Sequence, residues 1–172
     1  EHSVNLVPYS LLPNVEKRLT LTMGIDVEDS PFIIGIAGSL PVSKNLTLRG
    51  GIDSYGGDFG GGYGQYARYT NYEAGLDMYG GVVGVFGLGR FIIPTVGDPY
   101  SIFSGGLAFR IYNPDWFAFN ARVGISYSDT IAPHWEVELH SKMGIPYLVF
   151  GLKMGSSPRG NFETRFNIGL TF

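Results

Sequence analysis

The chain has 172 residues, a net charge of −3, 15% aromatic residues, only 16% charged residues and no Cys. Without Cys there is no disulfide scaffold, thiolate nucleophile or Cys-ligated metal, and the mild acidity argues against a protein that grips nucleic-acid phosphates. A hydrophobic fraction of 44% argues against disorder, yet no run approaches the roughly 18 apolar residues of a membrane helix. This composition, with 26 Gly, favours a single β-rich domain.

Residues 1–15 differ from the rest because Pro8 and Pro13 interrupt short apolar runs, so we expect an irregular arm there and one domain over 16–172. From Lys17 onward, apolar and polar residues alternate with the period of β-strands. The alternation is clean over 17–27, 46–55, 70–79, 116–127, 135–142 and 162–172, and weaker over 32–40, 82–93, 102–112 and 146–154. The sequence therefore predicts about ten strands, with eight or twelve as alternatives.

The connections between these strands fall into two alternating sets. One set is mostly short and rich in turn residues, at 41–45, 80–81, 113–115 and about 144–145. The other set is mostly longer, at 28–31, 56–65, 94–99, 129–134 and 155–161. In an up-and-down β-barrel the two sets lie at opposite ends, and this asymmetry is typical of membrane-spanning barrels.

Charged side chains keep to one face of the strands, while the opposite face is apolar. Acids and bases are interleaved on the charged face, with small polar residues between them, as expected of an enclosed space and not of a solvated surface. The predicted charge network comprises Arg49, Asp53, Glu73, Asp77, Arg110, Arg122, Glu136, Glu138, His140, Lys142, Lys153, Glu163 and Arg165. The orientation of 82–93 stays open because both of its faces are apolar apart from Arg90.

Large aromatic residues gather near the predicted strand ends, as they do where a membrane meets water. Those at the end with longer loops are Tyr69, Tyr72, Phe91, Phe103, Tyr127, Trp135 and Phe162, and those at the other end are Trp116, Phe117, Tyr147 and Phe172.

The last strand alternates through Phe166, Ile168 and Leu170 and stops on Phe172. Here the chain resembles bacterial outer-membrane β-barrel proteins, whose final strand ends in Phe with apolar residues at every second position before it. The resemblance implies an integral barrel in the outer membrane, a last strand that is read by the outer-membrane assembly machinery and closes against the first strand, and an arm on the periplasmic side. A soluble barrel or sandwich is the alternative interpretation.

A barrel of about ten strands is narrow, so we expect its lumen to be plugged by salt bridges between neighbouring strands. Lys153 could pair with Glu163, and Arg122 with Glu138 or His140. A narrow channel is the alternative.

Three constellations were weighed for catalysis or metal binding, and no catalytic, metal or cofactor site is predicted. His140 and Ser141 resemble the base and nucleophile of lipid deacylases, but adjacent strand residues point to opposite faces. Asp129 and His134 bracket a predicted loop at one barrel mouth. Glu136, Glu138 and His140 share a face, but Lys142 beside them opposes a cation.

The tract 56–64 holds closely spaced glycines without the Lys-Ser/Thr of a phosphate-binding loop, so it predicts a loop whose Phe59, Tyr63 and Tyr66 could contact a partner. The function predicted from these features is a structural, scaffolding or adhesion barrel, or a subunit of an envelope complex, with lipid and proteins as partners and no nucleic acid. A lipid- or peptide-modifying enzyme is the alternative from another class.

Overall fold

The computed structural model describes residues 17–26, 32–56, 68–113, 117–142 and 147–171, and the following account concerns these residues. They form ten β-strands in sequence order. These are β1 (Arg18–Asp26), β2 (Ile33–Pro41), β3 (Leu46–Tyr55), β4 (Tyr69–Gly80), β5 (Val83–Pro94), β6 (Tyr100–Asn113), β7 (Phe117–Tyr127), β8 (Ile131–Ser141), β9 (Leu148–Ser156) and β10 (Phe162–Thr171). None of the described residues belongs to a helix long and apolar enough to cross a membrane.

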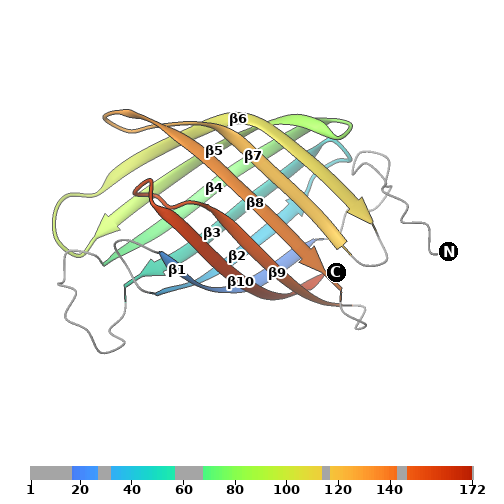
Figure 1. Ribbon diagram of the computed structural model, residues 1–172, viewed down its shortest axis with the longest axis horizontal. Helices are drawn as coiled ribbons and strands as arrows, with labels where there is room; N and C mark the ends of the chain where they lie inside the picture. The colour runs from blue at the N-terminus through green and yellow to red at the C-terminus, as the bar shows by residue number, and fades with distance from the viewer. Residues whose placement is uncertain (1–16, 27–31, 57–67, 114–116, 143–146, 172) are drawn as a thin grey trace.

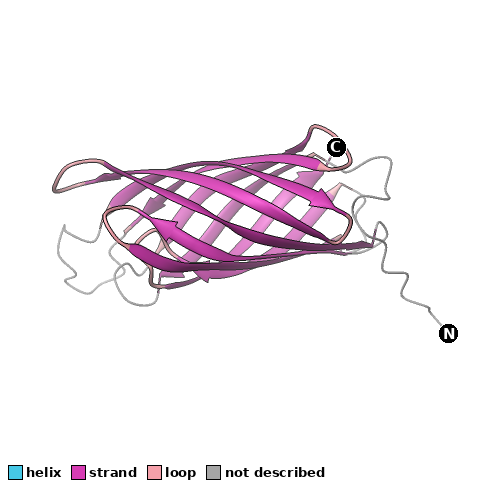
Figure 2. Cartoon of the chain, turned by 90° about the horizontal axis from the view of Figure 1, so that it is seen from above, coloured by secondary structure: helices cyan, strands magenta, loops and turns pink. Residues whose placement is uncertain are grey.

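The strands close into one antiparallel barrel in which each strand pairs with its neighbours in the sequence (Figure 1). Closure is completed by β1 and β10, which pair from Arg18 opposite Thr171 to Asp26 opposite Glu163. The strands run obliquely to the long axis of the barrel (Figure 2). The predicted all-β, up-and-down barrel of ten strands is therefore confirmed, and closure leaves no long free sheet edge.

The two ends of the barrel are named here by their connections. At the turn end, where β1 begins and β10 ends, the strands are joined by residues 42–45, 81–82, 114–116 and 142–147. At the loop end they are joined by 27–32, 56–68, 95–99, 128–130 and 157–161. Short turns at one end and longer loops at the other are the pattern of outer-membrane barrels, whose turns face the periplasm.

Alternation along each strand separates an apolar outer face from a polar lumen. On β10, for example, Phe166 and Leu170 are 67% and 54% exposed, whereas Arg165 and Asn167 on either side of Phe166 are buried. In the described strands, the outward positions carry no Asp, Glu, Lys, Arg or His. Such a surface is unstable in water but matches the hydrocarbon of a bilayer.

Strand β8 begins four residues earlier than predicted, at Ile131 instead of Trp135. Pro133 suggested a loop, because proline lacks the N–H that a sheet ladder needs. The pairing of β8 with β9 begins only at Glu136, so Pro133 removes no hydrogen bond from that ladder. As a result, β7 and β8 join through the tight connection 128–130, and His134 lies inside the barrel.

The aromatic residues predicted for the loop-end belt point outward, with one exception. Most of the loop-end residues predicted for this belt are exposed, and Trp135 stacks on Phe162 with ring centroids 5.8 Å apart. Tyr69 was wrongly assigned to the belt. It is 3% exposed and stacks on Tyr55 inside the lumen, at 4.2 Å between centroids. Its position at the end of a strand does not show whether the ring points to the lumen or to the outer face. Trp116 and Phe172 lie outside the described residues.

Candidate functional site

The lumen is the part of the molecule where chemistry-bearing side chains gather. The thirteen residues of the predicted charge network come from seven strands and from residue 142 directly after β8, and they occupy the lumen-facing positions of those segments. Because strand side chains alternate with a period of two, a strand that contributes two or three of them places them at successive heights. The barrel thereby brings together residues that are far apart in the sequence.

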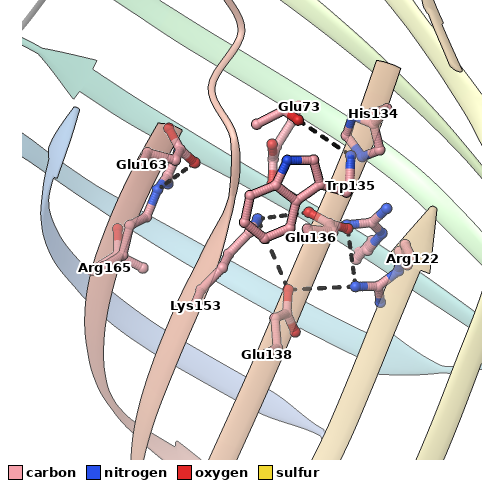
Figure 3. Close-up of polar contacts among 12 residues, drawn as sticks. Glu73, Arg122, His134, Trp135, Glu136, Glu138, Lys153, Glu163 and Arg165 are labelled. Carbon is pink, nitrogen blue, oxygen red and sulfur yellow. Dashed lines mark hydrogen bonds and ion pairs between the residues drawn. The ribbon is translucent and has the colours of Figure 1, made fainter. Parts of the chain in front are cut away.

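Glu136 lies at the centre of the best-defined group, the Glu136 cluster of Glu136, Arg49, Arg122 and Lys153 (Figure 3). Its Oε1 lies 2.6 Å from Arg49 Nη1 and 3.0 Å from Arg122 Nη1, and its Oε2 lies 3.1 Å from Lys153 Nζ. The Glu136 side chain is 1% exposed. One buried carboxylate therefore holds three cations from β3, β7 and β9, and ties opposite walls of the barrel together.

Arg122 extends this cluster toward the turn end. Its guanidinium grips Asp77 with two bonds, Nε to Oδ1 at 2.9 Å and Nη2 to Oδ2 at 2.5 Å. Arg122 also lies 3.5 Å from Glu138, which is one of the two pairings expected from the sequence. The planar fork of arginine suits such bidentate contact with a carboxylate, so the position of Arg122 is fixed from two sides.

A second group, the Arg165 cluster of Arg165, Asp53, Glu163 and Tyr55, lies nearer the loop end. Arg165 is 2.8 Å from both Asp53 and Glu163. It also donates a hydrogen bond to the Tyr55 hydroxyl, which in turn donates to Glu163 Oε2 at 2.7 Å.

The expected pairing of Lys153 with Glu163 was wrong. Arg165 stands directly opposite Lys153 in the β9–β10 register and takes Glu163 for itself, while Lys153 turns to Glu136.

Two lumen residues escaped the sequence analysis. Arg90, whose strand showed no clear orientation, faces inward and lies 3.6 Å from Glu73. His134, which was expected in a loop, is 1% exposed, and its Nδ1 is 3.4 Å from Ser126 Oγ. A charged residue in an otherwise apolar strand of a narrow barrel must face the lumen, because an arginine facing lipid costs about 2–4 kcal/mol. That argument was available for Arg90 from the sequence alone.

The remaining predicted network residues, Arg110, His140 and Lys142, lie toward the turn end. Arg110 sits over the Tyr79 ring, 3.7 Å from its centroid, and donates from Nη2 to the Lys44 carbonyl at 2.8 Å. His140 is 7% exposed.

Apolar side chains that the sequence analysis did not anticipate also fill the lumen. The loop-end apolar cluster consists of Ile33, Tyr55, Tyr69, Ile92 and Ile102, all of which are buried. A second cluster consists of Tyr79, Phe86, Leu88 and Ala108. Both include residues of β5, the strand whose orientation the sequence left open. The lumen is thus closed by hydrophobic packing as well as by ion pairs.

Inward-facing glycines make room for these long side chains. A Cβ on Gly35 would lie 2.0 Å from Asp53 Oδ1, and one on Gly155 would lie 2.9 Å from the Glu136 Cβ. Both distances are far below van der Waals contact. The glycines of β2 and β9 therefore allow charged groups of the neighbouring strands to lean across them.

The constellations considered for enzymatic chemistry are separated by the fold. His140 lies in the lumen, whereas Ser141 occupies the outward register of β8. His134 is buried inside the barrel, whereas Asp129 is exposed in the 128–130 connection, so the two do not flank one mouth as expected. Within the described ranges, no group of three or more His, Asp or Glu is arranged to hold a metal ion.

The final strand has the geometry implied by the resemblance. Phe166, Ile168 and Leu170 all point outward and are 42–67% exposed, and β10 pairs with β1 from Glu163 to Thr171. Phe172 lies outside the described residues, as do Phe59, Tyr63 and Tyr66 of the expected contact loop and the arm 1–15. Recognition of this strand by assembly machinery stays a prediction.

A scan against protein-family models and a search of curated proteins find no match. Solved structures do match. A designed transmembrane β-barrel aligns with a TM-score of 0.52 and 12% identity over 94% of this chain and 100% of its own. A porin aligns at 0.42 and 11%, covering 94% of this chain and 60% of the porin. Ail, the attachment invasion locus protein of Yersinia pestis, aligns at 0.36 and 8%, covering 91% and 97%.

The fold is that of an outer-membrane β-barrel. Its defining features are an even number of antiparallel strands, short turns at one end, an apolar outer band and a polar lumen. Since this outer surface requires hydrocarbon around it, the protein is a small membrane-spanning barrel of the bacterial outer membrane, in contact with its lipid.

Proposed function

We propose that this protein is a non-conducting structural barrel that serves as a scaffolding or adhesion component of the outer membrane, or as a subunit of an envelope complex. The observation that supports the proposal is the lumen, where the Glu136 and Arg165 clusters cross the middle and the loop-end apolar cluster lies beyond them. A barrel filled in this way offers no wide water path through the lumen. The protein therefore acts through contacts of its outer surface, its loops and its N-terminal arm with other envelope components.

Two measurements on the same preparation test this proposal: the conductance of the purified protein and the proteins that are purified together with it. Purified protein inserted into planar bilayers is expected to give no stable open level, because the ion pairs fix their side chains across the lumen. Stable, large conductance would contradict the non-conducting barrel and favour a channel. Purification from membranes in mild detergent is expected to retain a protein partner, and loss of that partner on deleting 1–15 would assign the contact to the arm.

The enzyme alternative has a separate test. Neither His140 with Ser141 nor His134 with Asp129 lies together, and the one Ser/His contact described, Ser126 with His134 at 3.4 Å, is enclosed in the lumen with His134 1% exposed. Lipid A and envelope peptide profiles are expected to be the same with and without the protein. A modified lipid or a cleaved peptide that depends on the protein would overturn the non-enzymatic role.

A further inference from the structure

A cavity of about 70 Å³ lies inside the barrel, mainly in its turn half. Its wall includes six cationic side chains from six strands, namely Arg18, Arg49, Arg110, Arg122, Lys153 and Arg165. The acidic side chains in the wall are three, Glu73, Asp77 and Glu138. The volume suits about five water molecules or one small polyatomic ion.

Most of these cations are paired with acids of the barrel, including Asp77 and Glu138 in the turn half, which both pair with Arg122. Arg165 is held by Asp53 and Glu163 toward the loop end, and Glu136 holds Arg49, Arg122 and Lys153 in the middle. Among the described residues, no carboxylate pairs with Arg18, which starts β1 at the turn end. Arg18 is therefore a positive charge in the turn half without a described carboxylate partner, and in a narrow lumen such a charge attracts an anion.

Several polar groups around the same cavity are buried without a hydrogen-bond partner. They are Arg18 Nη1, Arg49 Nη2, Tyr79 Oη, His140 Nδ1 and Asn167 Oδ1. The Tyr79, His140 and Asn167 side chains are 4%, 7% and 7% exposed. Buried groups of this kind are nearly always satisfied in a native protein, so their convergence on one cavity indicates that water or a ligand is their partner there.

The unpaired groups are mostly hydrogen-bond donors. Arginine nitrogens and the tyrosine hydroxyl donate, and His140 Nδ1 donates in one of its two neutral tautomers. They project from β1, β3, β4 and β8, and so approach the cavity from different sides. A tetrahedral oxyanion, with oxygens pointing in four directions and five heavy atoms in all, matches this arrangement better than a planar carboxylate.

We propose that the turn-end cavity is a binding site for a phosphate group, held by Arg18 and Arg49 with Tyr79 and His140 as further donors. The phosphate is either free inorganic phosphate or the terminal phosphate of a lipid headgroup, since both present the same oxyanion. The site supplies the barrel with a ligand-binding role that is separate from its structural one, and it does not require conductance.

The experiment is calorimetric titration of the purified full-length protein in a maltoside detergent, which contains no phosphate, at constant ionic strength. The first arm uses inorganic phosphate and the second a water-soluble short-chain phosphatidic acid. Saturable binding of one phosphate per chain in the first arm supports a free oxyanion as ligand. Binding in the second arm alone supports a headgroup. Absence of saturable binding in both arms overturns the proposal.

Two variants test the residues and one serves as a matched control. Arg18→Gln is expected to weaken binding by about tenfold or more, because it removes a charge-assisted hydrogen bond. Tyr79→Phe removes an unpaired hydroxyl at constant charge and is expected to weaken binding by about threefold or more. Lys17→Gln removes one positive charge from an exposed neighbour of Arg18 and is expected to change affinity by less than about twofold.

Two results would overturn the assignment. The first is an Arg18→Gln protein that binds phosphate as well as the unmodified protein. The second is a Lys17→Gln protein that loses as much affinity as Arg18→Gln, which would mean attraction by net charge and not a built site. Heat-modifiable migration on gels verifies that each variant is a folded barrel before titration.

Discussion

The loop half and the turn half of the lumen fill the same narrow barrel in different ways. Toward the loop end, Asp53 and Glu163 both pair with Arg165, and Glu73 pairs with Arg90. The loop-end apolar cluster of buried isoleucine and tyrosine side chains packs beyond these ion pairs. Toward the turn end, Arg18, Tyr79 and His140 surround a cavity with groups that have no partner. The loop half is neutralised and packed from within the chain, whereas the turn half combines the ion pairs of Arg122 and a second apolar cluster with several buried polar groups that lack a partner in the chain.

This difference shows where stability and binding are expected to reside. A buried ion pair contributes little net stability compared with apolar packing, but removing one partner from it is costly. Groups without partners have no such interaction to lose. Substitutions in the middle and loop half should therefore destabilise the barrel, whereas substitutions at the cavity should leave stability nearly unchanged and alter ligand binding.

The largest expected effect comes from Glu136→Ala. It leaves Arg49, Arg122 and Lys153 without their common acceptor, and stranding buried charges costs about 3–5 kcal/mol. Reversible urea unfolding in lipid vesicles, followed by tryptophan fluorescence, measures the change in the free energy of unfolding.

The control for this prediction is Asp129→Ala, which removes an exposed acid from the 128–130 connection and should change the free energy of unfolding by less than about 0.5 kcal/mol. A cost below about 1 kcal/mol for Glu136→Ala would show that the middle of the lumen does not depend on this carboxylate.

The next largest effect is expected when a charge is placed on the outer, lipid-facing side of a strand. Val123 points outward next to the inward Arg122 and is 51% exposed, so Val123→Arg places a charge in the bilayer at a cost of about 2–4 kcal/mol. Val96→Arg is the matched control, because Val96 is exposed in the connection 95–99 beyond the strands, and little change is expected there. Equal tolerance of both variants in vesicle unfolding would contradict the membrane orientation of β7.

A smaller loss is expected for Tyr55→Phe. The hydroxyl that this change removes accepts from Arg165 and donates to Glu163, and loss of a hydrogen bond to charged groups costs about 1–3 kcal/mol. Tyr127→Phe is the comparison, because Tyr127 is 57% exposed on the outer face. If both variants unfold at the same urea concentration, the Tyr55 bridge does not stabilise the loop half.

The smallest effect on stability is expected for Arg18→Gln, within about 0.5 kcal/mol of the unmodified protein in the absence of phosphate. Arg18 has no carboxylate partner among the described residues and leaves one nitrogen unpaired. Vesicle unfolding in phosphate-free buffer checks this. A loss above about 1.5 kcal/mol would mean that the turn half relies on its cations for structure, and the contrast between the two halves would fail.

Alternation predicted most of the fold because it is a local property of each strand. Nine of the ten strands begin within two residues of their expected positions, and the inward charges of the clean strands were assigned correctly. The two exceptions differ in cause. Pro133 could be placed only by knowing which strands lie beside it, since a proline is tolerated where no ladder bond is needed. The strand around Arg90 could have been oriented from the sequence, since an arginine must avoid lipid.

The sequence by itself predicted the two faces of most strands, a barrel of about ten strands and the class of protein, because period-two alternation and a lipid-facing surface are properties of each residue in turn. Only the tertiary structure decided which charges meet. Arg49 and Glu136 are 87 positions apart and lie 2.6 Å from each other because the barrel closes in one particular register. The same closure turned Tyr69 inward, gave Glu163 to Arg165 and left the turn-end cavity among unpaired donors.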